Sequence, residues 1–401
     1  MLCQFTFKNF KSYKDETIFD FQAATLPEFK ETLITAESAP MLLPVSAIYG
    51  PNGGGKSNLL QALSCVISTI VKPVHELEKN RQPLILQQKV DVTPFLFDEV
   101  SSNEPTEFKL FFLIDSNLYC YYIALTKDEV VSESLSRKSV TGKRSADIFD
   151  REKNKITLGY SINKKNININ VNPKMPYLSF LAINYEIPEI SGVITWFESC
   201  IIRNYANPVT EHQTMIEKYP IFKDQFIKAL NDMDIDITDY RYDEANKQLY
   251  TRRQLGNREY ELSFTEESDG TRKLIAALPV ILLALREGRL VIIDELDAKL
   301  HPKLLRYVIL LFKNKEINCH GAQLLFTSHD MSTMKNTIFR RDEIWFAACN
   351  ESHESDIYSL HELRNEDGTC IKNTAAYDKQ YLEGRYGADP YLQNMLGGAF
   401  K

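Results

Sequence analysis

The chain has 401 residues, of which 44% are hydrophobic and 25% charged, and its formal net charge is −7. These values are typical of a globular protein with two or three units and an ample core. The acidic balance argues against a protein that coats nucleic acid non-specifically, although it leaves room for a local basic face. Seven cysteines occur singly and the N-terminus has no signal-peptide pattern, so we expect reduced thiols and a cytoplasmic location. The most apolar stretch, 274–285, is too short to span a membrane.

The first elements in chain order are strands. Residues 2–10 and 17–23 alternate apolar and polar side chains, which predicts adjacent antiparallel strands. Residues 45–49 form a short apolar run that predicts another strand. The apolar run from Leu59 to Val71 predicts a helix, and Pro73 together with the charged run 75–81 predicts a break after it.

Between that strand and helix, residues 50–57 fit the phosphate-loop pattern G-x-x-x-x-G-K-[ST]. Glycines let such a loop turn its amide N–H groups inward, where they bind phosphate oxygens. Lys56 would add a charge at the β- and γ-phosphates, and Ser57 would offer a hydroxyl to Mg²⁺. The N-terminus of the following helix also favours an anion. The sequence therefore predicts a nucleoside-triphosphate site.

Residues 84–160 are strand-like and predict an antiparallel sheet, with strands at 108–114 and 118–125 on either side of an Asp-Ser-Asn turn. A basic stretch lies in and after this sheet and comprises Arg137, Lys138, Lys143, Arg144, Arg151, Lys153 and Lys155. It fits either a solvated hairpin or loop, or a contact surface for nucleic acid or an acidic partner.

Apolar residues at three- and four-residue spacing predict helices over 190–205 and 215–233. No heptad pattern is sustained, so a long coiled coil is not expected. Residues 238–264 return to strand-like alternation.

Two strands near the C-terminal end carry polar residues where they end. The run 289–296 reads as a buried parallel strand that delivers Asp294 and Glu295 at its carboxyl end, where open α/β sheets bind ligands. Asp294 suits a role in holding Mg²⁺, and Glu295 suits a role in orienting or deprotonating a water. A second strand, 322–326, precedes His329, which we expect to hydrogen-bond the γ-phosphate or the water.

A helix start precedes the carboxylate strand. Taken alone, Ser268 reads as a helix N-cap, but a serine and a glycine (Gly270) at a helix start also suit phosphate binding. Pro279 should kink this helix or restart it.

The order of these motifs resembles the ABC-type ATPase heads of the SMC, RecF and OLD proteins, over about 1–70 and 255–350. The resemblance implies an α/β fold, an ABC-type P-loop NTPase head with an antiparallel β subdomain and a short helical insertion in place of a coiled coil. In that family two heads hold two ATP molecules between them, and the signature of each head completes the other head's site. The implied roles are nucleotide binding for Asn52, Gly53, Gly54, Gly55, Lys56 and Ser57; Mg²⁺ binding for Ser57 and Asp294; catalysis for Lys56, Glu295 and His329; a trans signature of Ser268, Asp269 and Gly270; and a D-loop at Asp297.

Two features depart from the transporter members of that family. Asp269 stands where transporters have glycine, as is usual in the non-transporter heads, and the Q-loop has only Gln87 and Gln88 as candidates. The insert between Lys56 and Ser268 is too short for SMC arms, and the residues after His329 are too few for the nuclease domain of OLD proteins. The expected units are an N-terminal head part at 1–75, a β-rich subdomain at 76–175, a helical insertion at 176–250 and a C-terminal head part at 251–401.

The chain most resembles the compact bacterial ATPases of phage-defence and restriction-linked gene pairs that lack a fused nuclease. This implies a slow ATPase that uses ATP and Mg²⁺, pairs with itself, and controls a separate effector, such as a TOPRIM-type or other nuclease, with no membrane partner. The aromatic tail, 378–392, is either a packed segment or a docking peptide for that effector. The alternatives are a RecF-like or SMC-like DNA-repair ATPase that binds nucleic acid, and an assembly platform that barely hydrolyses ATP.

Overall fold

The computed structural model describes residues 1–35, 39–77, 92–160, 162, 166–205, 223–365 and 367–388. The candidates Gln87 and Gln88 lie outside the described residues, as does the first part of the helix expected at 215–233.

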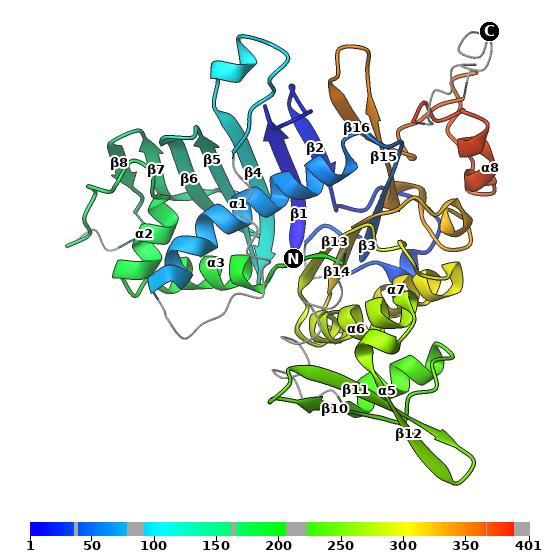
Figure 1. Cartoon of the computed structure of the whole chain (residues 1–401). Helices are drawn as coiled ribbons and strands as arrows, with labels where there is room; N and C mark the ends of the chain where they lie inside the picture. Colours follow the sequence, from blue (N-terminus) through cyan, green and yellow to red (C-terminus); the bar gives the residue numbers. More distant parts are fainter. Residues whose placement is uncertain are drawn as a thin grey trace, which may run out of the picture.

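Seven strands form an antiparallel sheet in the order β2-β1-β4-β5-β6-β7-β8 (Figure 1). Their bounds are β1 Leu2–Lys8, β2 Thr17–Asp20, β4 Thr106–Ile114, β5 Asn117–Leu125, β6 Val130–Ser139, β7 Ala146–Glu152 and β8 Lys155–Leu158. Because successive side chains of a strand face opposite ways, alternate residues such as Phe108, Leu110 and Phe112 are buried on one face. The predicted N-terminal strand pair and the predicted antiparallel sheet are both confirmed.

Six strands form the second sheet, in the order β16-β15-β3-β14-β13-β9. Their bounds are β3 Val45–Tyr49, β9 Ile201–Asn204, β13 Leu290–Asp294, β14 Gln323–Thr327, β15 Ile344–Cys349 and β16 Ser355–Ser359. All pairs are parallel except that of β15 with β16. The strands predicted at 45–49, 289–296 and 322–326 are confirmed. Since they are parallel, their carboxyl ends meet at one edge of the sheet.

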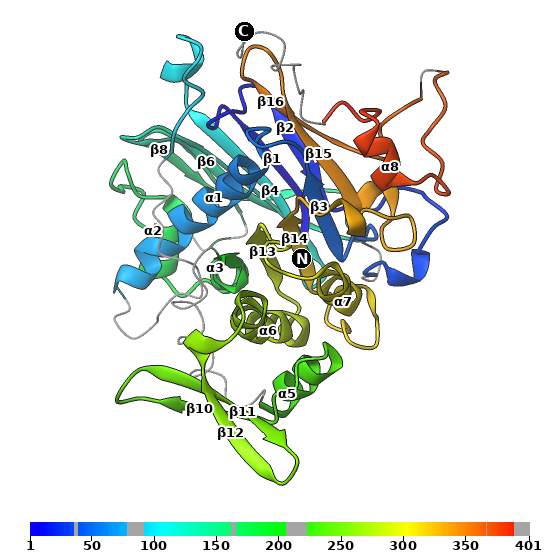
Figure 2. The same cartoon turned by 45° about the vertical axis from the view of Figure 1, so that its right-hand side comes forward.

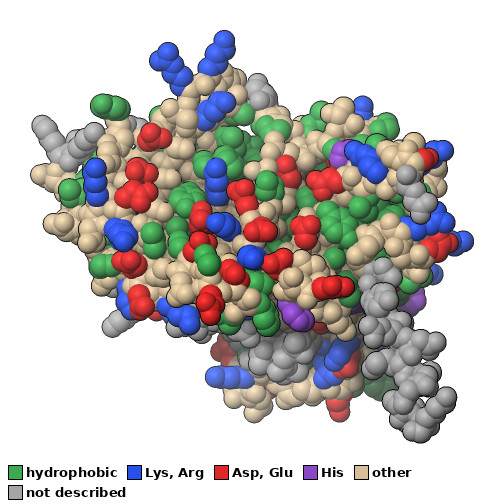
Figure 3. Space-filling view, turned by 90° about the horizontal axis from the view of Figure 1, so that it is seen from above, with side chains coloured by type: hydrophobic (Ala, Val, Ile, Leu, Met, Phe, Trp, Pro, Cys, Tyr) green, Lys and Arg blue, Asp and Glu red, His purple; other side chains and the backbone are tan. Residues whose placement is uncertain are grey.

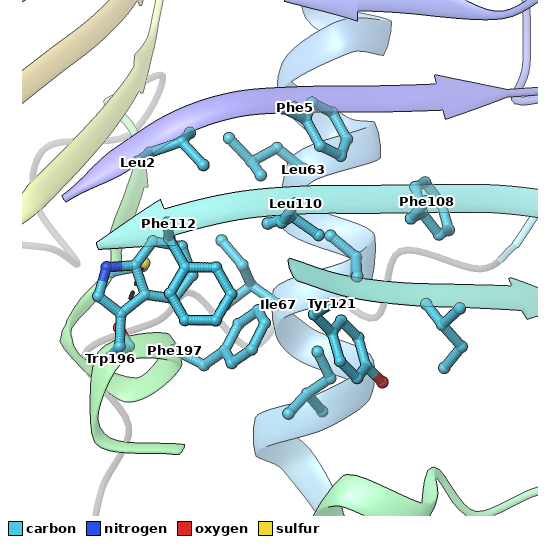
Figure 4. Packing of buried hydrophobic residues seen from close by; sticks show 14 of the residues in the cluster. Leu2, Phe5, Leu63, Ile67, Phe108, Leu110, Phe112, Tyr121, Trp196 and Phe197 are labelled. Carbon is cyan, nitrogen blue, oxygen red and sulfur yellow. Dashed lines mark hydrogen bonds between the residues drawn. The ribbon is translucent and has the colours of Figure 1, made fainter. Parts of the chain in front are cut away.

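Helix α1, Lys56–Leu77, lies between the two sheets and joins them into one core. In Figure 4, Leu63 and Ile67 of α1 lie beside residues of β1 and β4, such as Phe5 and Leu110. Trp196 extends this core, and its ring stacks on Phe112 at a centroid distance of 4.0 Å. Burial of these apolar side chains fixes the position of α1, and therefore of the phosphate loop at its N-terminus.

Among the described residues, only α1 is long and apolar enough to cross a membrane by length and composition. Most of that stretch, 61%, is buried inside the fold, as in the core helix of a globular protein.

Helix α1 does not end at Pro73 itself, and its described part ends within the run 75–81 where the break is predicted. The helix continues through Pro73 to Leu77, and the hydroxyl of Ser179 donates a hydrogen bond to the carbonyl of Ile70, one turn earlier (2.7 Å). A proline inside a helix removes one hydrogen bond to the preceding turn. Burial of the helix between the two sheets outweighs that loss.

Helices cover both faces of the six-stranded sheet (Figures 1 and 2). Helices α2, Tyr177–Asn184, and α3, Pro188–Ser199, pack beside α1, while α6, Asp269–Glu287, and α7, Pro302–Lys313, cover the opposite face. Helix α6 runs unbroken past Pro279, so of the two expectations for this proline, a kink or a restart, the restart was wrong. The helix is buried along most of its length, and packing holds it together across the proline.

The helix predicted over 190–205 was wrong at its C-terminal end. Helix α3 ends at Ser199, and β9 then pairs in parallel with β13 at the edge of the sheet. A short apolar run does not distinguish a strand from a helix by periodicity, and here the pairing with β13 decides.

The segment that follows in the described chain contains α5, Lys223–Asp232, and a small antiparallel sheet in the order β10-β11-β12. These strands, β10 Asp239–Asp243, β11 Gln248–Leu255 and β12 Arg258–Ser263, confirm the alternation seen in the sequence and lie at the bottom of Figure 1. Short 3-10 turns occur at Lys30–Thr32, Ser101–Asn103, Phe264–Glu266, Met331–Thr333 and Arg341–Glu343.

The described part of the tail is packed against the head. In and after α8, Tyr377–Leu382, the rings of Tyr381 and Tyr386 lie 5.6 and 5.2 Å from that of Phe346 on β15. The described residues 378–388 of the predicted tail are therefore packed on the head. Residues 389–392 of that tail lie outside the described residues, so its docking-peptide interpretation stays a prediction.

Candidate active site

The phosphate loop joins β3 to α1 and packs closely on the β15–β16 hairpin. Gly50 has φ of 144°, and a Cβ atom there would lie 2.1 Å from the carbonyl oxygen of Ala347. Gly55 has φ of 104°, and a Cβ atom there would lie 2.5 Å from the Ser355 hydroxyl. Only glycine satisfies both the backbone geometry and the space at these positions. The hairpin thus holds the loop in place, at the N-terminus of a buried helix.

Lys56 is nearly buried, and its ammonium group donates hydrogen bonds to the carbonyls of Gly50 and Pro51, both at 2.9 Å. Burial lowers its pKa, while the nearby carboxylates of Asp294, Glu295 and Asp297 act in the opposite direction. The ammonium therefore lies within the loop that is predicted to enclose phosphate.

Asp294 ends β13 and lies beside Ser57 of the phosphate loop. Two segments far apart in sequence therefore meet at this edge of the sheet. The Ser57 hydroxyl donates to Asp294 Oδ1 at 3.1 Å, and the Thr327 hydroxyl donates to the same atom at 2.6 Å. Adjacent ligands of an octahedral Mg²⁺, each about 2.0–2.1 Å from the ion, lie about 3 Å apart. The hydroxyl and carboxylate oxygens thus fit Mg²⁺, which proteins hold through one or two carboxylates together with substrate phosphates.

Glu295 follows β13 directly and begins a strained turn. Its φ of 52° lies in the left-handed region, which non-glycine residues seldom adopt. Its amide donates to the Thr327 hydroxyl at 2.7 Å, so one buried hydroxyl contacts both Asp294 and Glu295. The exposed side chain of Glu295 lines the cleft in front of the phosphate loop.

His329 is joined by a hydrogen bond to Asp297, in the turn after β13. The amide of His329 donates to Asp297 Oδ2 at 3.0 Å, and the exposed imidazole lines the cleft with Glu295. The other oxygen, Asp297 Oδ1, is buried without a hydrogen-bond partner among the described residues. The cleft holds about 170 Å³, and it is lined by Pro51, Asn52, Gly53, Gly55, Lys56, Ser57, Asn58, Glu295 and His329. The fold therefore brings together the predicted phosphate, metal and catalytic residues; Gly54 lies in the loop but does not line the cleft.

The predicted signature does not join this cleft. Ser268 is the N-cap of α6 and accepts a hydrogen bond from the Thr271 amide at 3.2 Å, which confirms its reading as a cap. Asp269 pairs with Lys299 at 3.0 Å and with Arg272. These hydrogen bonds lower the pKa of Asp269, and the one with Lys299 has the larger effect. Ser268 and Gly270 line a separate cavity of about 680 Å³, between α6, α7 and the segment after α5.

Three residues at the site were not singled out from the sequence. Thr327 ends β14, one strand away from Asp294, and a threonine at that strand end is a readable signal. Asn204 ends β9 and pairs with Asp294 in the parallel register, so an amide side chain lies at the same edge. Lys273 donates from α6 to the turn after β13. Asn204 could not be found from the sequence, because its position depends on the pairing of β9 with β13. Lys273 could not be found because its contact depends on the packing of α6.

The basic stretch divides into buried and exposed residues. Arg151 is fully buried and lies 3.7 Å from Glu133, and Arg137 pairs with Glu189 at 3.4 Å. Lys143 and Arg144 are exposed near the turn between β6 and β7. On the face of the molecule seen in Figure 3, acidic and basic side chains are interspersed. Arg151 is therefore a structural residue, whereas Lys143 and Arg144 keep both interpretations open.

A phosphate loop before a buried helix, facing a carboxylate at a parallel strand end, is the arrangement of a P-loop NTPase of the α/β class. Residues 45–335 match the family described as "AAA domain, putative AbiEii toxin, Type IV TA system", and the chain belongs to this family. No curated protein matches the sequence significantly. Among solved structures, the chain is similar to one described as "Crystal structure of the SmcHead bound to the C-winged helix domain of ScpA". The identity is 12% and the TM-score 0.46, over 91% of this chain and 98% of that chain.

Proposed function

We propose that this protein is a cytoplasmic ATP-binding and ATP-hydrolysing sensor or scaffold of a bacterial antiviral defence system. Two copies would close around two ATP molecules, and the nucleotide state would control a separate effector, such as a nuclease. The turnover is expected to be slow, because each site is complete only while the dimer is closed.

One observation carries this proposal. The phosphate loop and Glu295 line one cleft, and Asp294 accepts a hydrogen bond from Ser57 in that loop. Ser268 and Gly270 line a different cavity of the same chain. The serine hydroxyl and the amides at the start of α6 are suitable donors for a phosphate. A single chain does not bring these donors to its own loop. A second copy, related by a two-fold axis, supplies them to the first and receives the same in return.

The reaction is the attack of water on the γ-phosphorus, with cleavage of its bond to the oxygen that bridges to the β-phosphate. Glu295 orients the water and accepts its proton, while His329 hydrogen-bonds the γ-phosphate or the water. Lys56 and the amides of the loop stabilise charge on the phosphates. Ser57 and Asp294 would hold Mg²⁺, which supplies further charge neutralisation when bound.

A role in defence is supported by the family. Its description names a toxin of a type IV toxin–antitoxin system, and such systems consist of more than one component.

The first test compares wild type with Lys56→Ala and Glu295→Gln, measuring phosphate release and mass in solution with and without ATP and Mg²⁺. We expect slow release from wild type, an ATP-dependent dimer or larger assembly of Glu295→Gln, and neither from Lys56→Ala. If Glu295→Gln hydrolyses ATP like wild type and ATP leaves its mass unchanged, the proposal is wrong and a preassembled platform is the better explanation.

A mixing experiment tests the shared sites directly. Ser268→Arg blocks the signature and Lys56→Ala blocks the phosphate loop, so each variant should be inactive alone. A heterodimer of the two has one intact site. An equal mixture should regain about a quarter of the wild-type rate, because half of the dimers are heterodimers with one of two sites intact. A mixture as inactive as its components would contradict the shared site.

A further inference from the structure

The buried lysine of α6, Lys273, has a place in the site that no motif of the phosphate loop or carboxylate strand explains. It lies five residues after the N-cap Ser268, on the first buried turn of the helix, and only 2% of its surface is exposed. Its ammonium group donates to the carbonyl oxygen of Glu295 at 2.6 Å and to that of Ala298 at 2.9 Å.

These carbonyls belong to the turn 295–300, which begins at Glu295 and contains the predicted D-loop residue Asp297. The turn contains two non-glycine residues in the left-handed region, Glu295 with φ of 52° and Lys299 with φ of 64°. Within the turn, the Ala298 amide donates to the Glu295 carbonyl and the Leu300 amide to the Asp297 carbonyl. Such a strained turn keeps its shape only if its surroundings hold it.

The turn is held from two sides. On one side Thr327 accepts from the Glu295 amide, and the buried side chain of Leu296 anchors the turn in the core. On the other side Lys273 reaches the turn from α6 and binds the carbonyls of Glu295 and Ala298, while Asp269 of the same helix pairs with Lys299. Burial lowers the pKa of Lys273 to about 8, against the attraction of Asp297 and Glu295, so the fold buries this ammonium at a cost in hydration.

We propose that Lys273 is a positioning residue that fixes the catalytic carboxylate of Glu295, acting within its own head rather than through the signature at the start of its helix. The inference rests on the proposed function, since it assigns Glu295 to catalysis and Ser268 to the partner's site. The side chain of Lys273 touches neither nucleotide site directly. It acts by holding the backbone from which Glu295 extends, and a small displacement of that backbone misplaces the attacking water.

Lys273 could act by positioning Glu295 or by orienting Ser268, and these two roles affect the sites of different chains in the dimer. If Lys273 positions Glu295, its loss impairs the site whose phosphate loop lies on the same chain. If instead it only orients Ser268, its loss impairs the site on the partner chain. Mixed dimers with a single intact site separate these effects.

The reference is an equal mixture of Ser268→Arg with Lys56→Ala, in which the intact site uses the phosphate loop and Glu295 of the Ser268→Arg chain. Adding Lys273→Met to the Ser268→Arg chain should lower the rate of the mixture about ten- to hundred-fold. Adding it to the Lys56→Ala chain should leave the rate unchanged. Lys273→Arg, which keeps the charge and the donors, should restore most of the rate in the first mixture.

The opposite pattern, or an equal loss in both mixtures, would overturn the positioning role. Urea unfolding of each variant shows whether the chains are folded, and ATP binding to Lys273→Met should match wild type because the phosphate loop is intact. The reference mixture also separates the two proposals. If it shows no activity, the shared-site proposal fails; if it is active but insensitive to the position of Lys273→Met, only the role of Lys273 fails.

Discussion

Two clusters of charged residues in this protein serve different ends. In the first, inside the antiparallel sheet, both Glu133 and Arg151 are fully buried. Glu133 accepts hydrogen bonds from the Tyr121 hydroxyl and from the amides of Tyr177 and Leu178, and Arg151 donates to three backbone carbonyls. Both the carboxylate of Glu133 and the guanidinium of Arg151 are therefore hydrogen-bonded to groups within the fold.

The second cluster, at the carboxyl edge of the six-stranded sheet, has hydrogen-bonding capacity to spare. Asp297 Oδ1 is buried without a partner among the described residues, and the carboxylate of Glu295 and the imidazole of His329 line an open cleft. Charges that fold partners satisfy stabilise a structure, whereas charges left unsatisfied beside a cleft are available to a ligand. The comparison predicts loss of activity at the edge and loss of stability in the sheet.

The largest expected effect is on the rate of hydrolysis. Glu295→Gln removes the proton acceptor but keeps the size of the side chain, so the rate should fall about 10²- to 10⁴-fold. Because the side chain is exposed, the free energy of unfolding should change by less than about 0.5 kcal/mol. Phosphate release and urea unfolding measure the two quantities. A large loss of stability would mean that the edge cluster is structural after all.

The reverse is expected in the antiparallel sheet. Arg151→Met leaves Glu133 buried without its cation and should lower the free energy of unfolding by about 3–5 kcal/mol. The matched control is Arg137→Met, whose ion pair with Glu189 is partly exposed and should contribute no more than about 1 kcal/mol. Equal losses from the two variants, measured by urea unfolding, would show that burial does not distinguish these arginines.

Lys273 makes the stability of the protein depend on pH. Its pKa is about 8 in the folded protein and lies below the ordinary value of 10.5, so between these pH values the unfolded chain binds more protons. The free energy of unfolding should therefore rise with pH in this window, by at most about 3 kcal/mol at 1.36 kcal/mol per pKa unit.

Lys273→Met has no titrating group at this position and serves as the reference. The difference in unfolding free energy between wild type and this variant should grow in favour of wild type from pH 8 to 10.5. A difference that stays constant with pH would mean that the lysine is not buried as an ammonium.

Thr327 offers a smaller effect at the same edge. Thr327→Val keeps the shape of the side chain but leaves the Glu295 amide without its acceptor, which should cost about 1–3 kcal/mol of stability. Hydrolysis should fall as well, because the same hydroxyl donates to Asp294. Thr327→Ser keeps the hydroxyl and should recover both. If valine is tolerated as well as serine, the hydroxyl does not organise this edge.

The sequence could predict those parts of the site that are coded locally. The phosphate loop, the strands that carry Asp294 and precede His329, and the N-cap at Ser268 are each contained in a few consecutive residues. The strand at 201–204 could not be predicted, because its apolar residues also fit a helix until β13 pairs with them. The role of Lys273 depends on a contact with a turn more than twenty residues away, which only the packing of α6 determines.

The burial of Arg151 could not be predicted either, because it too depends on contacts that form only in the fold. In the sequence it belongs to a run of basic residues that suggests a solvated or nucleic-acid-binding surface. In the fold, alternation along β7 turns it inward, so that it meets Glu133 on the neighbouring strand β6. Charge counted along a chain is thus a poor guide to charge on a surface when the chain is a strand.

The smallest effects are expected at the exposed end of this basic run. Lys143→Ala with Arg144→Ala should change the free energy of unfolding by less than about 0.5 kcal/mol, because both side chains are exposed. The variant also decides between the two interpretations of the run. A solvated hairpin predicts that binding to duplex DNA, measured from 50 to 200 mM salt, is as weak for the variant as for wild type. A DNA-contacting surface instead predicts affinity for DNA that falls steeply with salt, and a shallower salt dependence, by about one or two in slope, when these two charges are removed.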